Sequence, residues 1–333
     1  MKSRSKTFSL FVAAAVLSLG IVSPAMAAAK YVIKLGVVAA PTAPYSMGAV
    51  EVSKAMKELT NGEVDVQVFP SGQLGNQSDL VQGVVMGTVD IVMSSSAALT
   101  QFAPKVQLID MPFIFRDRAH IYGALDDPEI AAELFSQLKS VGRYICTWEN
   151  GIRQLVNSKR PIRKPEDAKG LKMRSMESAI YIEMFKAIGA NPTPMAYGEL
   201  FTALQQGTVD GSDQTTNLLL FDRFYEVQKY LTMTNHSYSP EIVIVSEHTY
   251  KRVPAEYMKL LEEQLIKFKD WNRKVCTDEE ENYIKELEKL GMEVIKLTPE
   301  EYEGFKAVML PVWSKFEDRV GKDLINKVVN FGK

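Results

Sequence analysis

Cysteine and histidine are scarce in this chain, which has two cysteines and three histidines among 333 residues. Cys146 and Cys276 lie far apart, which excludes a disulfide framework of the kind that small secreted proteins use. A single disulfide between them is one alternative, and two buried or partly buried thiols are the other. His120, His236 and His248 are scattered, without a cysteine or paired carboxylate at metal-ligand spacing. We therefore expect neither a metal site nor a cofactor.

A strong excess of charge of either sign is also absent, because 39 basic and 41 acidic side chains give a formal net charge of −2. The lysines and arginines are interspersed with acids, which predicts that no nucleic acid is bound. The chain lacks the motifs of phosphate-binding loops, dinucleotide-binding turns, zinc peptidases and serine hydrolases. No pair of carboxylates stands out as an acid/base couple. These absences favour binding without turnover.

Long apolar runs are missing beyond the start of the chain. The apolar segment at residues 8–22 follows three basic residues and leads to the small residues Ala25 and Ala27, a pattern typical of a secretory signal peptide. A membrane anchor is the alternative, but the run is shorter than the roughly 20 residues that span a bilayer. We therefore expect residues 1–27 to be cleaved off and the mature protein to be exported.

What the sequence does contain is an alternation of strand-like and helix-like segments. The predicted strands lie at 31–38, 64–69 and 90–93, and the predicted helices between them lie at 46–60 and 76–86. This order predicts an α/β fold with an open, mostly parallel sheet.

The stretch at residues 170–211 repeats this pattern. A short strand brings Arg174 to its carboxyl end, a helix follows, and a second helix at 198–206 leads into another strand. The run Gly-Thr-Val-Asp closes that helix at 207–210 and also occurs at 87–90. This repetition favours two lobes built alike, whose strand ends face a shared crevice. Open α/β folds bind ligands in such crevices.

The predicted boundaries divide the chain between two lobes. We assign residues 28–150 and 240–278 to lobe I, and residues 151–239 and 279–333 to lobe II. Residues 255–290 contain neither proline nor glycine, so one helix of roughly 54 Å would span both lobes. Two helices broken near Thr277 are the alternative. We expect turns at 149–151 and 191–194, and a helix at 221–230.

The most informative cation is Arg174, at the end of a strand that faces the crevice. Its guanidinium group fits a carboxylate through two hydrogen bonds, and a structural ion pair is the alternative. Arg153 follows the crossing between the lobes and has the same two alternatives. Tyr197 could lie against a ligand or pack in the core. The hydroxyl groups of residues 94–96 could contact a ligand or cap the next helix.

Several runs, taken together and in order, resemble the DctP-type periplasmic substrate-binding proteins of tripartite ATP-independent periplasmic (TRAP) transporters. They are FPSGQLG at 69–75, GIR at 151–153, GLKMR at 170–174, GANPTPM at 189–195, ELFTALQQG at 199–207, VDG at 209–211 and MTNH at 233–236. The resemblance covers essentially all of the chain after residue 27. It implies a two-lobe periplasmic binding protein fold, with crossing strands and a long helix that spans both lobes.

The resemblance also implies roles for particular side chains. The arginine of the GLKMR run, Arg174, clamps the carboxylate of the ligand, and Arg153 of the GIR run assists it. Tyr197 packs on the ligand. The distal end of the ligand is contacted by Ser95, Gln77 and Glu177.

The chain departs from the family pattern at some of these positions. Where members commonly read VDGxENP, this chain has Asp213 and Gln214 and lacks the proline. Gln214 still offers an amide donor, one methylene further out. Ser95 stands where sialate-binding relatives have an acid, which argues against sialic acid. Trp148 and Glu149 come directly before the lobe crossing, where an indole wall and an acidic acceptor would suit a polyhydroxylated acid; a core position for Trp148 is the alternative.

We therefore predict a non-enzymatic, monomeric solute-binding protein that captures a small organic acid by lobe closure and delivers it to the membrane permease subunits of a TRAP transporter. A sugar acid such as a uronate or an aldonate is favoured. The alternatives are a C4-dicarboxylate, a keto acid or a sulfonate as the ligand, or presentation of the ligand to a membrane sensor. A secreted enzyme acting on sugar acids is disfavoured because no acid/base constellation is present.

Overall fold

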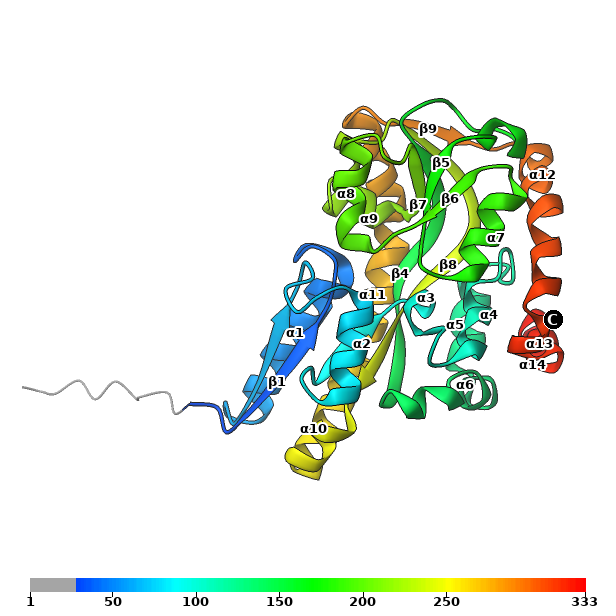
Figure 1. Ribbon diagram of the computed structural model, residues 1–333. Helices are drawn as coiled ribbons and strands as arrows, with labels where there is room; N and C mark the ends of the chain where they lie inside the picture. The colour runs from blue at the N-terminus through cyan, green and yellow to red at the C-terminus, as the bar shows by residue number, and fades with distance from the viewer. Residues whose placement is uncertain (1–27) are drawn as a thin grey trace, which may run out of the picture.

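The structure is a computed structural model that describes residues 28–333 (Figure 1). The predicted signal peptide, residues 1–27, lies outside the described residues. Within residues 28–333, no helix has both the length and the apolar character needed to cross a membrane.

One nine-stranded sheet runs through the molecule. Its strands are β1 (Tyr31–Gly36), β2 (Val64–Phe69), β3 (Ile91–Ser94), β4 (Arg143–Asn157), β5 (Lys172–Ser175), β6 (Asn191–Pro194), β7 (Gly211–Thr215), β8 (Tyr230–Val245) and β9 (Glu293–Lys296). They lie in the order β2-β1-β3-β8-β4-β7-β5-β6, and β9 pairs with β8. Strands β1 to β3 therefore lie on one side of the β8–β4 pair, and β5 to β7 lie on the other.

The long strands β4 and β8 belong to both lobes, because the two ends of each pair with different neighbours. Residues 242–245 of β8 pair with β3, whereas residues 230–233 pair with β9. Residues 153–157 of β4 pair with β7. This arrangement confirms the predicted crossing strands and the two-lobe fold. The boundaries assigned to the lobes fall within β4, β8 and one long helix, and they stay a prediction.

Helices pack on both faces of the sheet (Figure 1). The α-helices are α1 (Pro44–Leu59), α2 (Gln77–Met86), α3 (Ser96–Leu99), α4 (Gln107–Asp110), α5 (Arg118–Asp126), α6 (Pro128–Leu134), α7 (Ala179–Ala187), α8 (Tyr197–Gln205), α9 (Thr216–Phe221), α10 (Glu247–Arg252), α11 (Ala255–Lys289), α12 (Pro299–Met309), α13 (Glu317–Val320) and α14 (Lys322–Asn330). Short 3-10 helices are η1 (Pro104–Val106), η2 (Ser136–Ser140), η3 (Pro165–Ala168), η4 (Phe224–Glu226) and η5 (Leu310–Lys315).

Strand β3 shows how the sheet divides the core, because successive side chains of a strand point to opposite faces. Ile91 and Met93 pack in the core cluster that contains Met56 of α1 and Leu261 of α11. Val92 packs in the cluster on the other face, with residues of α2. The sheet is therefore buried on both faces, as the apolar strand sequences predict.

Helix α11 is a single helix of 35 residues. Leu261 and Leu265 pack in the core cluster that includes α1 and β1, whereas Leu287 packs in the cluster that includes Leu200 of α8. The helix therefore reaches both lobes, as predicted. The alternative of two helices broken near Thr277 is wrong.

The two Gly-Thr-Val-Asp runs have the same role in the two lobes. The glycine of each run follows a helix and has a positive φ, 76° in one and 71° in the other, which glycine adopts without strain. Asp90 Oδ2 accepts a hydrogen bond from the backbone N–H of Lys34 at 2.8 Å. Asp210 Oδ2 accepts one from the N–H of Lys172 at 2.9 Å. Each run therefore ties a helix end to a neighbouring strand, β1 in one lobe and β5 in the other.

The predicted turn at 149–151 is wrong, because these residues lie within β4. The pairing of β4 with β8 shifts register between Glu149 and Gly151, so the strand continues through a bulge. Gly151 has φ 143°. A Cβ at this position would lie 3.2 Å from Cβ of Thr215, so both the backbone conformation and the close approach of β7 favour glycine.

Two further local predictions are wrong. Residues 191–194 form the strand β6 rather than a turn, because β6 is the last strand of the sheet and prolines are tolerated in an edge strand. The helix predicted at 221–230 is wrong, because the helix in this region, α9, already ends at Phe221. Arg223 then adopts φ 60°, and pairing with β4 and β9 makes a strand from Tyr230 onward.

Candidate functional site

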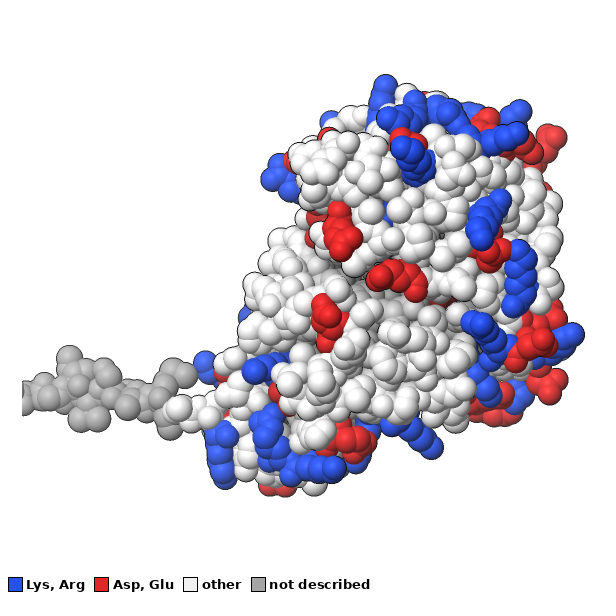
Figure 2. Space-filling view, viewed as in Figure 1, with Lys and Arg blue, Asp and Glu red and all other residues white. Residues whose placement is uncertain are grey.

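A cavity lies where the ends of strands and helices from both lobes meet. Seven residues that the sequence predicts as ligand contacts line it: Gln77, Ser95, Arg153, Arg174, Glu177, Tyr197 and Gln214. In Figure 2, Lys and Arg gather toward the two ends and the right-hand edge of the visible face, and its centre is mostly uncharged apart from a few acidic side chains. Among the described residues that line the cavity, the positive charge lies on two buried arginines, Arg153 and Arg174.

Arg174 stands at the third position of the four-residue strand β5 and is buried, with 3% of its surface exposed. Its Nε donates a hydrogen bond to the carbonyl oxygen of Met195 at 2.9 Å. Within residues 28–333, no carboxylate oxygen forms an ion pair with this guanidinium group. Burial and the neighbouring charge of Arg153 lower the pKa of Arg174 to about 10, so the group is still protonated at neutral pH. The structural ion pair considered for Arg174 is not formed.

Arg153, on β4, is also buried but has a partner. Its Nε lies 2.5 Å from Asp213 Oδ2, and one of its terminal nitrogens lies 3.0 Å from Asp213 Oδ1. His236 Nε2 lies 3.3 Å from the same carboxylate. Burial alone would raise the pKa of Asp213, but Arg153 and His236 hold it well below its usual range. The charge of Arg153 is therefore balanced within the protein, although the side chain also lines the cavity.

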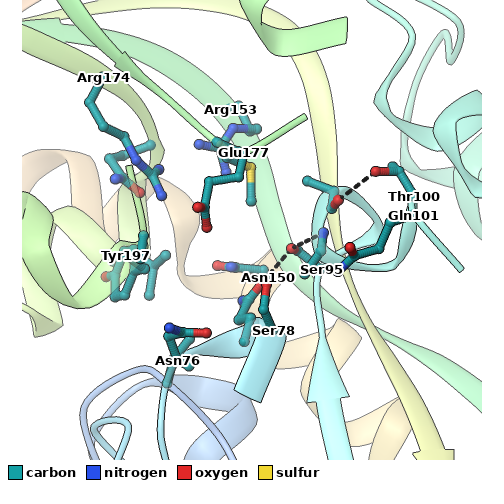
Figure 3. A pocket seen from close by; sticks show the side chains of 18 of the residues that line it. Asn76, Ser78, Ser95, Thr100, Gln101, Asn150, Arg153, Arg174, Glu177 and Tyr197 are labelled. Carbon is teal, nitrogen blue, oxygen red and sulfur yellow. Dashed lines mark hydrogen bonds between the residues drawn. The ribbon is translucent and has the colours of Figure 1, made fainter. Parts of the chain in front are cut away.

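The opposite end of the cavity is polar, and none of the described residues that line it there is a cation. Figure 3 shows Asn76, Ser78 and Ser95 facing the two arginines across the cavity. Ser95 Oγ donates to Gln77 Oε1 at 2.5 Å and accepts from the N–H of Ala98 at 3.4 Å. Ser95 therefore caps α3, one of the two alternatives for the serine run, and it also lines the cavity; its contact with a ligand stays a prediction.

Two buried amide side chains also line the cavity. Gln214 is buried, and its Nε2 has no hydrogen-bond partner among the described residues. Asn150 lines the cavity next to it; its Oδ1 accepts from Thr215 Oγ1 at 2.9 Å, and its Nδ2 donates to Glu241 Oε1 at 3.2 Å. A buried N–H without a partner costs free energy, so the Gln214 amide is a donor that a ligand oxygen would satisfy.

Two further side chains shape the cavity walls. Glu177 is exposed, and Figure 3 shows its carboxylate directed toward the middle of the cavity. Tyr197 begins α8, and its ring lies edge-on to Phe224 with 5.8 Å between ring centroids. Its hydroxyl group donates to Asp222 Oδ2 at 2.7 Å. Tyr197 therefore presents its ring, rather than its hydroxyl group, to the cavity.

Trp148, Glu149 and Asp213 do not line the cavity, which corrects three predicted contacts. Trp148 is fully buried and donates from Nε1 to the carbonyl oxygen of Leu265 on α11 at 3.0 Å. It is a core residue, the alternative considered from the sequence. Asp213 is the ion-pair partner of Arg153.

Glu149 is fully buried on the α5 and α11 side of β4. Its Oε1 accepts from Arg118 Nε at 3.0 Å, its Oε2 accepts from the hydroxyl group of Tyr122, and its N–H donates to Asn272 Oδ1 at 2.8 Å. A carboxylate held in this way is a structural ion-pair partner. The register shift after Glu149 explains the error, because it is the next residue, Asn150, that reaches the cavity.

Some lining residues were missed from the sequence. Tyr45, Asn76, Ser78 and Asn150 line the cavity, in addition to Val38, Ala97, Ala98, Thr100, Gln101, Met176, Ala196 and Leu218. Most of them follow the end of a strand or begin a helix, which is a signal that could have found them. Asn76, for example, is the N-cap of α2, where its Oδ1 accepts from the N–H of Asp79 at 3.0 Å.

Two α/β lobes that share crossing strands around a polar, cation-bearing cavity define a solute-binding protein. The chain belongs to the DctP family, described as bacterial extracellular solute-binding protein, family 7, which it matches over residues 35–319. This confirms the predicted family. Its members are solute-binding proteins, and this chain is likewise not an enzyme, so the alternative of a secreted sugar-acid enzyme falls.

Several relatives are named for a small organic acid that they bind, and similar solved structures include TRAP periplasmic solute-binding proteins. The chain is 33% identical over 296 residues to the 2,3-diketo-L-gulonate-binding periplasmic protein of Escherichia coli (strain K12), covering 89% of this chain and 88% of the relative. It is similar to a TRAP periplasmic solute-binding protein from Sulfurospirillum deleyianum DSM 6946 with bound succinate (TM-score 0.88, 34% identity, 91% of this chain and 99% of that chain). A TRAP periplasmic solute-binding protein from Polaromonas sp. JS666 bound to D-erythronate gives a TM-score of 0.86 at 34% identity, covering 91% of this chain and 99% of that chain.

Proposed function

We propose that this protein is the periplasmic component of a TRAP transporter that captures a sugar acid, such as an aldonate or a uronate, and hands it unchanged to the membrane permease. In this proposal the acid's carboxylate pairs with Arg174 while its hydroxyl groups meet the polar end of the cavity. The protein acts as a monomer after cleavage of residues 1–27.

The observation that carries the proposal is the difference between the two buried arginines. Arg153 has Asp213 as its partner, whereas among the described residues Arg174 has only the carbonyl oxygen of Met195. An uncompensated buried charge costs several kcal/mol, and a carboxylate in the cavity would remove much of that cost. Two parallel N–H···O bonds to the free edge of the guanidinium group would also fix the orientation of the acid.

The charge balance of the cavity favours one carboxylate per ligand. After the Arg153–Asp213 pair is set aside, Arg174 is the remaining cation among the described lining residues, and Glu177 is an anion. A second carboxylate would therefore meet amides, hydroxyl groups and Glu177. Hydroxyl groups suit those partners better, because they both donate to carboxylate and amide oxygens and accept from amide N–H groups.

Capture requires that the acid bind the closed arrangement more tightly than an open one. Arg174 and Gln214 come from β5 and β7 of one lobe, whereas Gln77 begins α2 and Ser95 caps α3 in the other. An acid that contacts both groups does so only when the lobes are closed. Its binding energy therefore favours closure, which would present a closed surface to the permease.

A thermal-shift panel tests the choice of acid, because a ligand that binds the native state raises the midpoint of unfolding. We expect D-erythronate and D-galacturonate at 1 mM to raise the midpoint more than succinate or methanesulfonate. Replacing Glu177 by Gln should narrow the gap between the sugar acids and succinate, since it removes the repulsion of a second carboxylate. A larger shift with succinate than with either sugar acid in the wild type would contradict the sugar-acid assignment.

Transport and sensing predict different consequences of deleting the gene. A transport role predicts loss of uptake of the radiolabelled acid, restored by the wild type but not by Arg174→Ala. A sensing role predicts intact uptake and loss of a transcriptional response to the acid.

Light scattering coupled to size exclusion should give the mass of one mature chain, and a stable dimer would contradict the expected monomer.

A further inference from the structure

One carboxylate beside the cavity joins three segments that are far apart in the sequence. Asp222 follows α9 in the lobe that contains β5 to β7. Its Oδ2 accepts from the hydroxyl group of Tyr197 at 2.7 Å, and its Oδ1 accepts from the N–H of Ala40 at 2.8 Å. Ala40 lies in the β1–α1 loop of the other lobe. Asp222 therefore links the two lobes directly through the Ala40 amide, and it also holds Tyr197, a residue that lines the cavity.

Tyr197, the first partner of Asp222, packs against the hydrophobic cores of both lobes. The Tyr197 ring packs against the core cluster of β1 and α1 and also against the cluster that contains Leu200 and Phe224. Tyr197 itself begins α8 and lines the cavity. The bond to Asp222 thus fixes an aromatic wall of the cavity at the junction between the lobes.

The side of Asp222 that faces Ala40 is tied to the cavity as well. Val38 in the same loop and Tyr45 at the start of α1, on either side of Ala40, both line it. The loop is anchored within its own lobe, because the N–H of Ser71 donates to the carbonyl oxygen of Ala39 at 2.8 Å. Movement of this loop relative to Asp222 would therefore be movement of one lobe relative to the other.

We propose that Asp222 is a positioning residue for ligand capture, which holds the Tyr197 ring in the cavity wall and latches the two lobes through the Ala40 amide. The proposal rests on the proposed function, in which the lobes close on an acid. Both carboxylate oxygens have a donor only while the lobes are together. Opening would release the Ala40 N–H and leave one oxygen of a mostly buried carboxylate to find water, so the bond favours the closed arrangement.

The test compares four variants of the full mature chain with the wild type. Asp222→Ala removes both contacts. Asp222→Asn keeps an oxygen for the Ala40 N–H and an amide that can donate to the Tyr197 oxygen, and Tyr197→Phe removes one contact only. Glu226→Ala is the matched control, since this nearby carboxylate pairs only with the exposed Arg223.

Two readouts separate a latch from a general loss of stability. Amide hydrogen exchange at Ala40 is measured without added acid and with D-erythronate or succinate at saturation. Association and dissociation rates of the same acids are measured by stopped-flow fluorescence. Closure on either acid engages the latch, so the outcome does not depend on which acid is preferred.

We expect Asp222→Ala to speed exchange at Ala40 in every arm and to raise the dissociation rate about tenfold, with association changed by less than about threefold. Asp222→Asn and Glu226→Ala should retain protection at Ala40, and Tyr197→Phe should raise dissociation while Ala40 stays protected.

Unchanged Ala40 exchange in Asp222→Ala would overturn the latch, as would exchange that rises equally throughout residues 28–333. If Asp222→Ala does not fold, unchanged dissociation in Tyr197→Phe overturns the positioning role. If neither acid binds the wild type, the proposed sugar-acid function fails, and the acid-free exchange at Ala40 still decides the latch.

Discussion

At the scale of single residues, the two cavity arginines differ in their partners rather than in their burial. Arg153 and Arg174 are 2% and 3% exposed. Asp213 neutralises Arg153, and no described carboxylate does the same for Arg174. The sequence places both arginines at the crevice. It does not show which one is paired, because Asp213 lies 60 residues from Arg153 and reaches it only through the pairing of β4 with β7.

The errors at Trp148 and Glu149 also arise from strand pairing that the sequence does not reveal. Alternation along a strand predicts which side chains share a face, and one extra residue reverses the pattern. The register shift between Glu149 and Gly151 does this where the strand passes between the lobes. Asn150 reaches the cavity as a result, and only the pairing partner on β8 reveals the shift.

Glu241 carries a prediction about pH. It is fully buried beneath Asn150, and its Oε2 has no hydrogen-bond partner among the described residues. Burial raises the pKa of Glu241 to about 8, against the lowering effects of Asn150 and Arg153. In the unfolded chain the Glu241 carboxyl group releases its proton at about pH 4.3. Between these values the folded protein holds a proton that the unfolded chain lacks, so stability falls as pH rises through this window.

Glu241→Gln removes this titration and keeps an oxygen for the Asn150 amide. We expect its free energy of unfolding to match the wild type near pH 4.5 and to exceed it at pH 8, by an amount on the order of a few kcal/mol. Urea denaturation at a series of pH values measures the difference. Burial also raises the pKa of Asp110, to about 7, so part of the dependence of stability on pH remains in the variant. Identical pH profiles for the two proteins would show that Glu241 is ionised throughout.

At the scale of elements, α11 is the clearest success of sequence reasoning. Its 35 residues contain no helix breaker, so local propensity and tertiary packing agree. The segment after Phe221 shows the opposite case. Its sequence has helical spacing, but the left-handed turn at Arg223 and the pairing of β8 prevail. Strand pairing between distant segments cannot be predicted from a single stretch, because propensity is weak compared with tertiary contacts.

The continuity of α11 predicts what a break in its middle would do. Thr277 is exposed on α11 and close to the predicted boundary between the lobes. Thr277→Pro removes a backbone hydrogen bond and is expected to lower the free energy of unfolding by about 3 kcal/mol. Thr277→Ala is the control and should change it by less than about 1 kcal/mol.

The same pair of variants tests whether α11 limits rotation of the lobes. Small-angle scattering without added acid should show a broader distribution of shapes for Thr277→Pro than for Thr277→Ala. If the proline variant kept both the stability and the scattering profile of the control, α11 would not restrain the lobes as a single rod.

At the scale of the whole molecule, most of the architecture was predictable and the shape of the cavity was not. Repeated runs such as the two Gly-Thr-Val-Asp segments, and the spacing of apolar residues, predict two similar lobes. The polar end of the cavity depends on how α2 and α3 of one lobe meet β5 and β7 of the other across β4, which both lobes share. Such contacts join segments far apart in the chain, so single-sequence patterns carry little information about them.

The account as a whole depends on pairing between Arg174 and the carboxylate of a bound acid. The most direct test is a calorimetric titration of D-erythronate into the wild type, Arg174→Ala and the control Arg143→Ala, whose arginine is exposed and pairs with Glu247 on the surface. We expect Arg174→Ala to lose about 3–5 kcal/mol of binding free energy, at least a hundredfold in affinity, while it unfolds at the wild-type temperature or above it. Arg143→Ala should bind like the wild type. Affinity within a few-fold of the wild type in Arg174→Ala would contradict the account.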